Sequence, residues 1–99
     1  MRTIKQTSQF KRDLKREAKL KRQAKGPHRQ ALQSEFVAIV GALANDELLD
    51  EKHRDHALTG DWEDCRDCHI KPDLVLIYQK LDETLLQLVR LGSHSELGL

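Results

Sequence analysis

The spacing of the apolar residues changes halfway along the chain, and this change constrains the fold more than any other feature. In residues 8–44 apolar residues recur every three or four positions, which places them on one face of a helix. The two stripes contain Phe10, Leu14 and Ala18, then Leu32, Phe36, Ile39, Val40 and Leu43. After Leu58 short apolar runs alternate with turns, and residues 74–78 form a near-continuous apolar run typical of a buried strand. The sequence therefore predicts helices followed by a sheet.

Turn and cap signals set the expected boundaries. Residues 2–7 favour a first strand, and Ser8 can cap the helix that follows it. Gly26-Pro27 is expected to end this helix, because proline lacks an N–H and restricts the residue before it. A second helix is expected from His28 to Ala44, then a polar loop over 45–56. Strands over 62–70, 74–78 and 84–91 would form an antiparallel meander.

The expected order of elements is β-α-α-β-β-β. This is an α+β fold in which a helical hairpin packs on one face of a four-stranded, mainly antiparallel sheet. Ninety-nine residues suit a single domain spanning 1–99. With 38% hydrophobic and 33% charged residues, the chain is too apolar for a disordered protein.

The sequence shows no signal for membrane insertion or export. No apolar run reaches the roughly 18–20 residues that span a bilayer, and the first residues lead into charge instead of an apolar stretch. We therefore expect a cytoplasmic protein without a membrane partner. Its two cysteines should stay reduced in that compartment.

Positive charge is concentrated at the start of the chain. Residues 1–29 contain eleven Lys and Arg against two acidic residues, whereas residues 30–99 contain six against fourteen. A basic segment of this kind suits a polyanion such as nucleic acid. It also suits an acidic protein partner, or a solvated helix face without a partner. Charge alone does not choose among these three.

Residues 65–69 spell C-x-x-C-H, the pattern that attaches c-type haem. The context disfavours haem, because Met1 is the only methionine and no export signal precedes the motif. On a strand, residues three apart face opposite sides, so Cys65 and Cys68 should diverge. The same geometry disfavours zinc, which also lacks a second ligand pair. We expect no haem, metal or other cofactor, and interpret both cysteines as small strand residues.

Four histidines lie in the acidic part of the chain, at positions 53, 56, 69 and 94. Histidine suits proton transfer because its ordinary pKa of about 6.5 leaves both forms accessible at neutral pH. Cleavage of RNA without a metal needs a base for the 2′-OH, an acid for the leaving 5′-oxygen and a cation for the developing charge. A surface or loop role remains the alternative for any single histidine.

Three motifs in the second half resemble a known family. Residues 55–62 match D-H-x-L-x-G-x-W, residues 66–78 match R-D-x-H-x-x-P-D-x-x-L-I-Y, and residues 90–94 match R-x-G-S-H. Their order and spacing resemble the YafQ branch of the RelE/ParE toxin superfamily, over roughly the last 45 residues. The first half is similar in its order of elements and its basic helix.

The resemblance implies a RelE-like fold and a toxin function. Such toxins are endoribonucleases that cleave the mRNA codon in the A site of the 70S ribosome, and a cognate antitoxin neutralises them. The active-site residues implied are His56, His69, Asp73, Arg90 and His94. We hypothesise that His94 is the general acid and that His56 or Asp73 is the base. His69 would orient the phosphate or a partner side chain, and Arg90 would stabilise developing charge.

The basic helix then has a candidate partner in ribosomal RNA. The residues expected to bind RNA are Lys11, Arg12, Lys15, Arg16, Lys19, Arg22 and Arg66. The tail Glu96–Leu99 departs from the family, whose members often carry an aromatic residue there that can stack on a base. Leu97 or Leu99 could replace that contact, or Trp62 could stack instead. A core position is the favoured expectation for Trp62, as it is for Tyr78.

Two other functions remain as alternatives. One is a ParE-like toxin that shares the fold but not the nuclease chemistry, and such relatives generally lack this set of histidines. The other is a non-enzymatic module in which the basic helix docks an acidic partner.

Overall fold

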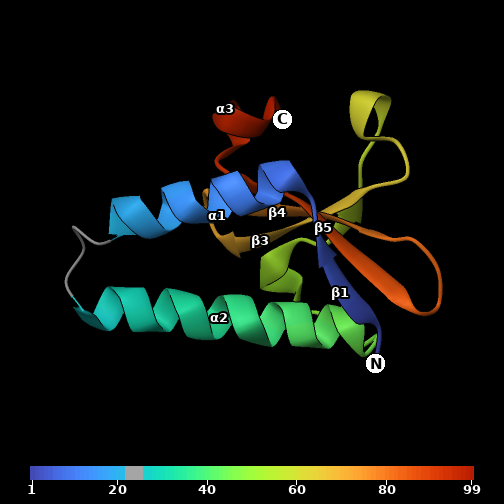
Figure 1. Ribbon diagram of the computed structural model, residues 1–99, viewed down its shortest axis with the longest axis horizontal. Helices are drawn as coiled ribbons and strands as arrows, with labels where there is room; N and C mark the ends of the chain where they lie inside the picture. The colour runs from blue at the N-terminus through green and yellow to red at the C-terminus, as the bar shows by residue number, and fades with distance from the viewer. Residues whose placement is uncertain (22–25) are drawn as a thin grey trace.

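The computed structural model describes residues 1–21 and 26–99 (Figure 1). Side chains are described at every position except 18–33. The first elements are strand β1 (Thr3–Gln6), helix α1 (Ser8–Lys21) and helix α2 (Gly26–Ala44). The remaining strands are β2 (His56–Ala57), β3 (Arg66–Lys71), β4 (Leu74–Lys80) and β5 (Leu85–Gly92). Two 3₁₀ turns, η1 (Glu51–His53) and η2 (Gly60–Trp62), flank β2, and a one-turn helix, α3 (His94–Leu97), follows β5. The predicted α+β class is confirmed.

The sheet has five strands in the order β1-β5-β4-β3-β2, so the predicted count of four was wrong. The added strand is β2, which pairs with β3 through only two residues, His56 and Ala57. A strand this short shows no alternation of apolar and polar residues, and the segment was predicted as loop. Strand β1 runs parallel to β5, and every other pairing is antiparallel. The sheet is therefore mixed, with its parallel pair at one edge.

Three predicted boundaries need correction. Gly26-Pro27 begins α2 instead of ending α1, because a proline in the first turn of a helix loses no hydrogen bond. Thr7 caps α1 in place of Ser8: its Oγ1 accepts a hydrogen bond of 3.0 Å from the backbone N of Phe10. The strand expected from Trp62 starts only at Arg66, since residues 60–62 form the η2 turn.

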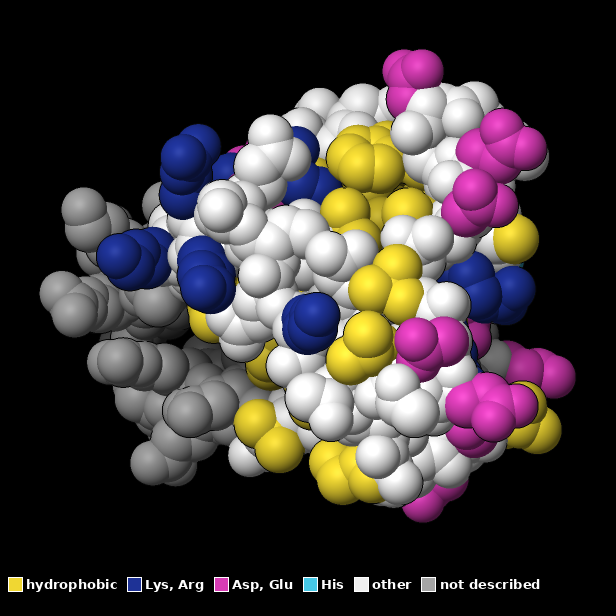
Figure 2. Space-filling view, turned by 45° about the vertical axis from the view of Figure 1, so that its right-hand side comes forward, with side chains coloured by type: hydrophobic (Ala, Val, Ile, Leu, Met, Phe, Trp, Pro, Cys, Tyr) yellow, Lys and Arg dark blue, Asp and Glu magenta, His cyan; other side chains and the backbone are white. Residues whose placement is uncertain are grey.

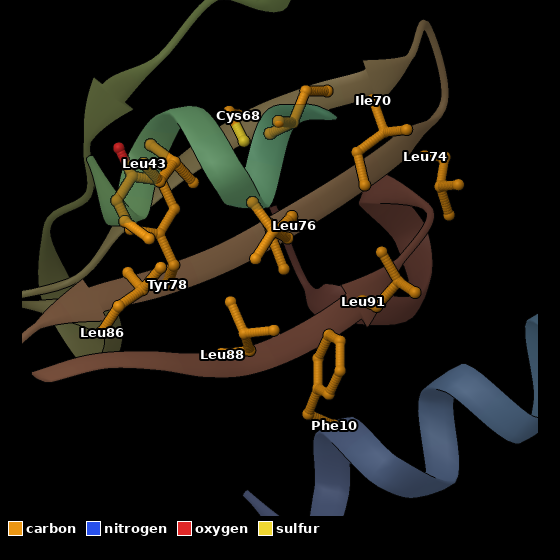
Figure 3. Close-up of a cluster of buried hydrophobic side chains, with 13 residues drawn as sticks. Phe10, Leu43, Cys68, Ile70, Leu74, Leu76, Tyr78, Leu86, Leu88 and Leu91 are labelled. Atoms are coloured by element: carbon orange, nitrogen blue, oxygen red, sulfur yellow. The ribbon is translucent and has the colours of Figure 1, made fainter. Parts of the chain in front are cut away.

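The main core lies between the sheet and the two long helices (Figure 3). Phe10 of α1 stacks on Phe36 of α2, with ring centroids 6.1 Å apart. The helices contribute Phe10, Ile39, Val40, Leu43 and Ala44, and the sheet contributes Cys68, Ile70, Leu74, Leu76, Tyr78, Leu86, Leu88 and Leu91. The predicted apolar stripe of the second helix is confirmed from Phe36 onward, and Ala18 and Leu32 lie outside the described side chains.

A second, smaller core covers the opposite face of the sheet. Its buried members are Val75 and Ile77 of β4 and Leu97 of α3, with Trp62 and Cys65 packed against them. Trp62 is therefore a core residue, as predicted. Leu97 is buried in this cluster, so its side chain is not available to contact RNA.

The two cysteines lie in different cores, one on each side of the sheet, which confirms the predicted divergence. Both are free thiols. Burial raises the pKa of the Cys68 thiol to about 12, so this sulfur stays protonated. Across residues 1–21 and 26–99, none of the helices combines the length and apolar character needed to cross a membrane.

Candidate active site

The register of the sheet places several predicted site residues on the face opposite the long helices. His56 of β2 pairs with Asp67 of β3, Asp67 pairs with Ile77 of β4, and Ile77 pairs with Arg90 of β5. Residues directly opposite each other on neighbouring strands share a face, so these four form one row across the sheet. His69, two residues beyond Asp67, belongs to the same face.

Three of the predicted residues meet where β3, the β3–β4 turn and α3 come together. Asp73 Oδ1 lies 3.0 Å from His94 Nδ1 and accepts a second hydrogen bond of 3.3 Å from the His94 backbone N. The rings of His69 and His94 pack edge to face, with centroids 4.9 Å apart. The structure therefore brings together His69, Asp73 and His94 from segments about twenty residues apart.

A cleft of about 520 Å³ opens beside this cluster. His69, His94, Lys71 and Pro72 line one part of it. The rest of the lining consists of Glu35, Lys52, His53, Arg54 and Ile70. Three cations against one carboxylate make the cleft suitable for an anionic ligand, although Lys71 is already paired with Glu35 at 3.0 Å.

The surroundings of the cluster shift two pKa values. Burial lowers the pKa of His69, and the nearby charge of His94 lowers it further, so the His69 ring is held neutral at pH 7. The hydrogen bonds from His94 to Asp73 lower the pKa of that carboxyl. An ionised carboxylate only accepts hydrogen bonds, so His94 Nδ1 carries the proton between them and Nε2 is the other reactive nitrogen.

His56 lies beside a buried carboxylate. Its Nδ1 is 2.7 Å from the carbonyl oxygen of Arg54 and 2.9 Å from Asp67 Oδ1. Asp67 is only 2% exposed, and within the described part of the chain its Oδ1 finds no hydrogen-bond partner of good geometry. Burial raises the Asp67 pKa, while the charges of the three nearby histidines oppose that shift. His53 supports strand β3, because its Nδ1 lies 2.7 Å from the carbonyl oxygen of His69.

The segment that carries His56 is anchored to the sheet by its neighbour Asp55. Asp55 Oδ1 accepts a hydrogen bond of 2.6 Å from the Tyr78 hydroxyl and one of 3.1 Å from Arg66 Nε. The Tyr78 ring is buried in the main core, as predicted. Arg66, expected to bind RNA, thus has an internal partner.

Replacing Tyr78 with Phe is expected to lower the free energy of unfolding by about 1–2 kcal/mol, because a bond to a carboxylate is lost while the buried ring is kept. Urea denaturation followed by circular dichroism measures this, with an unchanged denaturant slope as the check that the folded state is intact. A wild-type midpoint for this variant would contradict the anchoring role.

Arg90 is held by α1. Its Nε and Nη2 bind the two carboxylate oxygens of Asp13 at 2.7 and 3.3 Å, and Asp13 Oδ2 also accepts a 3.0 Å hydrogen bond from the Leu91 backbone N. Asp13 is only 3% exposed. Its own burial acts to raise its pKa, but the bonds from Arg90 and Leu91 and the charges of Arg90 and Arg16 lower the pKa overall. Arg90 is therefore oriented by a partner that sequence analysis did not identify.

Apart from Arg66, the residues expected to bind RNA divide into three groups. Lys11, Arg12 and Lys15 are exposed on α1. In Figure 2 about half of the visible Lys and Arg side chains lie on the left, whereas the acidic side chains lie mainly on the right. Arg16 instead makes internal contacts with Asp13 and Leu91, so we remove it from the RNA-binding set. The side chain of Lys19 and the whole of Arg22 lie outside the described residues.

The sequence analysis did not select Lys52, Arg54, Asp55 or Asp67 for the site. The signal available for three of them was position, since Arg54, Asp55 and Asp67 adjoin or fall within the motifs of 55–62 and 66–78. The partners of Asp55 and Asp67 come from other strands, and Lys52 and Arg54 line the cleft. No spacing rule within one segment reveals such contacts.

Comparison with known proteins defines the class of this chain. Residues 2–98 match the family model described as the bacterial toxin of type II toxin–antitoxin system, YafQ. The mRNA interferase toxin YafQ of Escherichia coli strain B is 33% identical over 97 residues, covering 97% of this chain and 95% of that protein. The fold and this match define a toxin of a type II toxin–antitoxin system.

Solved structures are similar in fold to this chain over nearly its whole length. A metal-bound toxin from Helicobacter pylori is 43% identical, with a TM-score of 0.80, covering 98% of this chain and 99% of that one. YafQ in the E. coli DinJ–YafQ complex is 32% identical, with a TM-score of 0.74 and 98% coverage of both chains. This chain belongs to the YafQ toxin family.

Proposed function

We propose that this protein is an endoribonuclease that cleaves mRNA in the ribosomal A site by acid–base chemistry at the 2′-OH, without a metal ion. The observation that carries the proposal is the cluster of His69, Asp73 and His94 beside a cation-lined cleft. The name mRNA interferase borne by the E. coli relative supports the cleavage of mRNA.

The reaction needs two proton transfers. A base takes the proton of the 2′-OH, and the 2′-oxygen attacks the adjacent phosphorus. The bond from phosphorus to the 5′-oxygen then breaks, and an acid protonates that oxygen. The products are a 2′,3′-cyclic phosphate and a 5′-hydroxyl end, so every atom and proton is accounted for without an oxidant or a cofactor.

We assign the acid to His94 and the base to His56. Asp73 accepts the Nδ1 proton of His94, which leaves Nε2 to carry the proton given to the leaving group. Asp73 itself makes a weak base, because its pKa is lowered and its Oδ1 is already bound to His94. His56 uses Nδ1 toward the Arg54 carbonyl, so its Nε2 is free for the 2′-OH.

We assign charge stabilisation to Arg90 and the cations of the cleft. Arg90 uses Nε and Nη2 toward Asp13, which leaves Nη1 for a phosphate oxygen. Arg54 and Lys52 line the cleft next to His69. His69, held neutral, would orient the phosphate between them.

We propose the ribosome and an antitoxin as partners. The exposed Lys11, Arg12 and Lys15 of α1 form a surface suited to ribosomal RNA phosphates, which give affinity without reading sequence. The E. coli relative has been solved as the DinJ–YafQ toxin–antitoxin complex. A cognate antitoxin of this chain would have to block the site or the basic surface to neutralise it.

Primer extension on a reporter transcript tests the function. The full chain is induced in cells carrying either a translated reporter or the same reporter with its start codon inactivated. We expect cuts inside in-frame codons of the translated reporter alone. Equal cutting of the untranslated reporter would reject ribosome dependence. Growth arrest with intact mRNA would reject the nuclease and favour the ParE-like alternative.

A further inference from the structure

Helix α3 carries His94 but is too short to be stable alone. It has four residues, and an isolated helical turn costs more to nucleate than its hydrogen bonds return. Ser93 and Glu96 form a capping box, in which Ser93 Oγ accepts from the Glu96 backbone N and Glu96 Oε1 accepts from the Ser93 backbone N. These bonds shape the turn, but they do not fix it relative to the sheet.

Arg16 of α1 makes that connection. Its Nη1 binds Asp13 Oδ1 at 3.1 Å and its Nη2 donates to the Leu91 carbonyl oxygen at 2.9 Å. Its Nε lies 3.1 Å from Glu96 Oε2, an ion pair without hydrogen-bond geometry. One guanidinium therefore contacts α1, β5 and α3 at once. A guanidinium spreads its charge and donors over three nitrogens, whereas a lysine ammonium places them all on one atom.

The backbone of β5 leaves room for this arrangement at Gly92. A Cβ at that position would lie 2.9 Å from Arg16 Nη2 and 3.5 Å from atoms of the Glu96 side chain. Any side chain at residue 92 would therefore push against the guanidinium between α1 and α3. The glycine immediately precedes Ser93, the residue that caps α3.

We propose that Arg16 is a positioning residue that holds His94 in place through Glu96 and Ser93. The path runs from the buried Asp13 to Arg16, on to the Glu96 carboxylate, and through the capping box to the turn that begins at His94. It keeps the His94 ring against Asp73 and His69. The inference rests on the proposed function, since it assigns a role in cleavage to a residue that touches no reacting atom.

The test uses single-turnover cleavage on ribosomes programmed with mRNA, with the full chain in excess. We expect Arg16→Met to lower the plateau rate by about 10- to 100-fold, the effect of a small misplacement of a catalytic group. The concentration that gives half the plateau rate should stay at the wild-type value. If Arg16 acted as a phosphate contact, that concentration would rise instead and the plateau rate would remain, which would overturn the proposal.

A second variant guards against loss of folding. Glu96→Gln keeps an acceptor for the capping box but removes the charge that faces Arg16. Glu96→Gln should lower the plateau rate as Arg16→Met does. The double variant should be no slower than the slower of the two single variants, because both changes break the same contact between Arg16 and Glu96. Additive losses in the double variant would contradict a shared path.

Arg2→Met is the matched control. Arg2 also pairs with a carboxylate, that of Asp46, and its Nε donates to the Asp82 carbonyl oxygen at 2.9 Å. It lies next to Thr3, which pairs with Leu85 at the far end of β5 from α3. Its loss should reduce stability but leave the plateau rate unchanged.

Nuclear magnetic resonance of the imidazole groups gives a readout that does not depend on cleavage. In Arg16→Met the His94 Nδ1–H signal should broaden or shift as its bond to Asp73 loosens, and in Arg2→Met it should not. An unchanged signal together with a wild-type plateau rate would sink the inference. If the wild type itself fails to cleave, the proposed function fails, and the signal alone decides whether Arg16 positions His94.

Discussion

Replacing His94 with Gln is expected to lower the single-turnover cleavage rate on programmed ribosomes by about 10²- to 10⁴-fold, the usual contribution of a general acid. Glutamine can keep a hydrogen bond to Asp73 but cannot transfer a proton at pH 7. The fold should be retained, because the His94 ring belongs to neither core. Circular dichroism provides the check on folding.

A modified substrate separates the acid from other roles of His94. With sulfur in place of the 5′-oxygen at the cut site, the leaving group departs without needing a proton. His94→Gln should then cleave at a rate close to that of the wild type. An equal loss on the oxygen and sulfur substrates would mean that His94 does not act as the acid.

Replacing Asp13 with Asn is expected to lower the free energy of unfolding by about 3 kcal/mol at pH 7. The change leaves Arg90 and Arg16 without their shared carboxylate, and removing one partner of a buried ion pair is strongly destabilising. Guanidinium denaturation measures the loss. Asp61→Asn, an exposed position in the η2 turn, is the matched control and should change stability by less than about 0.5 kcal/mol.

The effect of Asp13 should depend on pH in a defined direction. The pKa of this carboxyl is lowered in the folded state, so its contribution is complete above the ordinary carboxyl pKa of about 4 and is lost as the pH falls through the folded value. The difference in stability between wild type and Asp13→Asn should therefore shrink at acidic pH. A difference that stays constant from pH 7 to pH 3 would contradict this account.

Local sequence signals predicted most of the elements. The stripe containing Phe36, Ile39 and Leu43 and the apolar run of 74–78 became core, as their periodicity indicated. The signal for where a helix begins or ends failed at Gly26-Pro27. A proline can end one helix or begin the next, and only the tertiary arrangement decided that Pro27 begins α2.

The candidate site was predictable in its residues but not in its connections. The motifs selected His69, Asp73 and His94, and the structure brings these three together. The contacts of Asp13 and Arg16 with β5 and α3 join residues about 75 positions or more apart. Such pairings depend on how α1 lies against the sheet, which helix periodicity does not specify. This is why Arg16 was expected to bind RNA.

The pairing of β1 with β5 has a consequence for how the protein is made. The Thr7 hydroxyl, just after β1, donates to the carbonyl of Val89 across 82 residues, and β1 has its strand partner only when β5 is present. Long-range pairing of this kind folds late. A nascent chain that does not yet include β5 lacks the partner strand of β1 and also lacks His94, which follows β5. A chain cut before β5 should therefore be unable to cleave mRNA, because it lacks the proposed general acid.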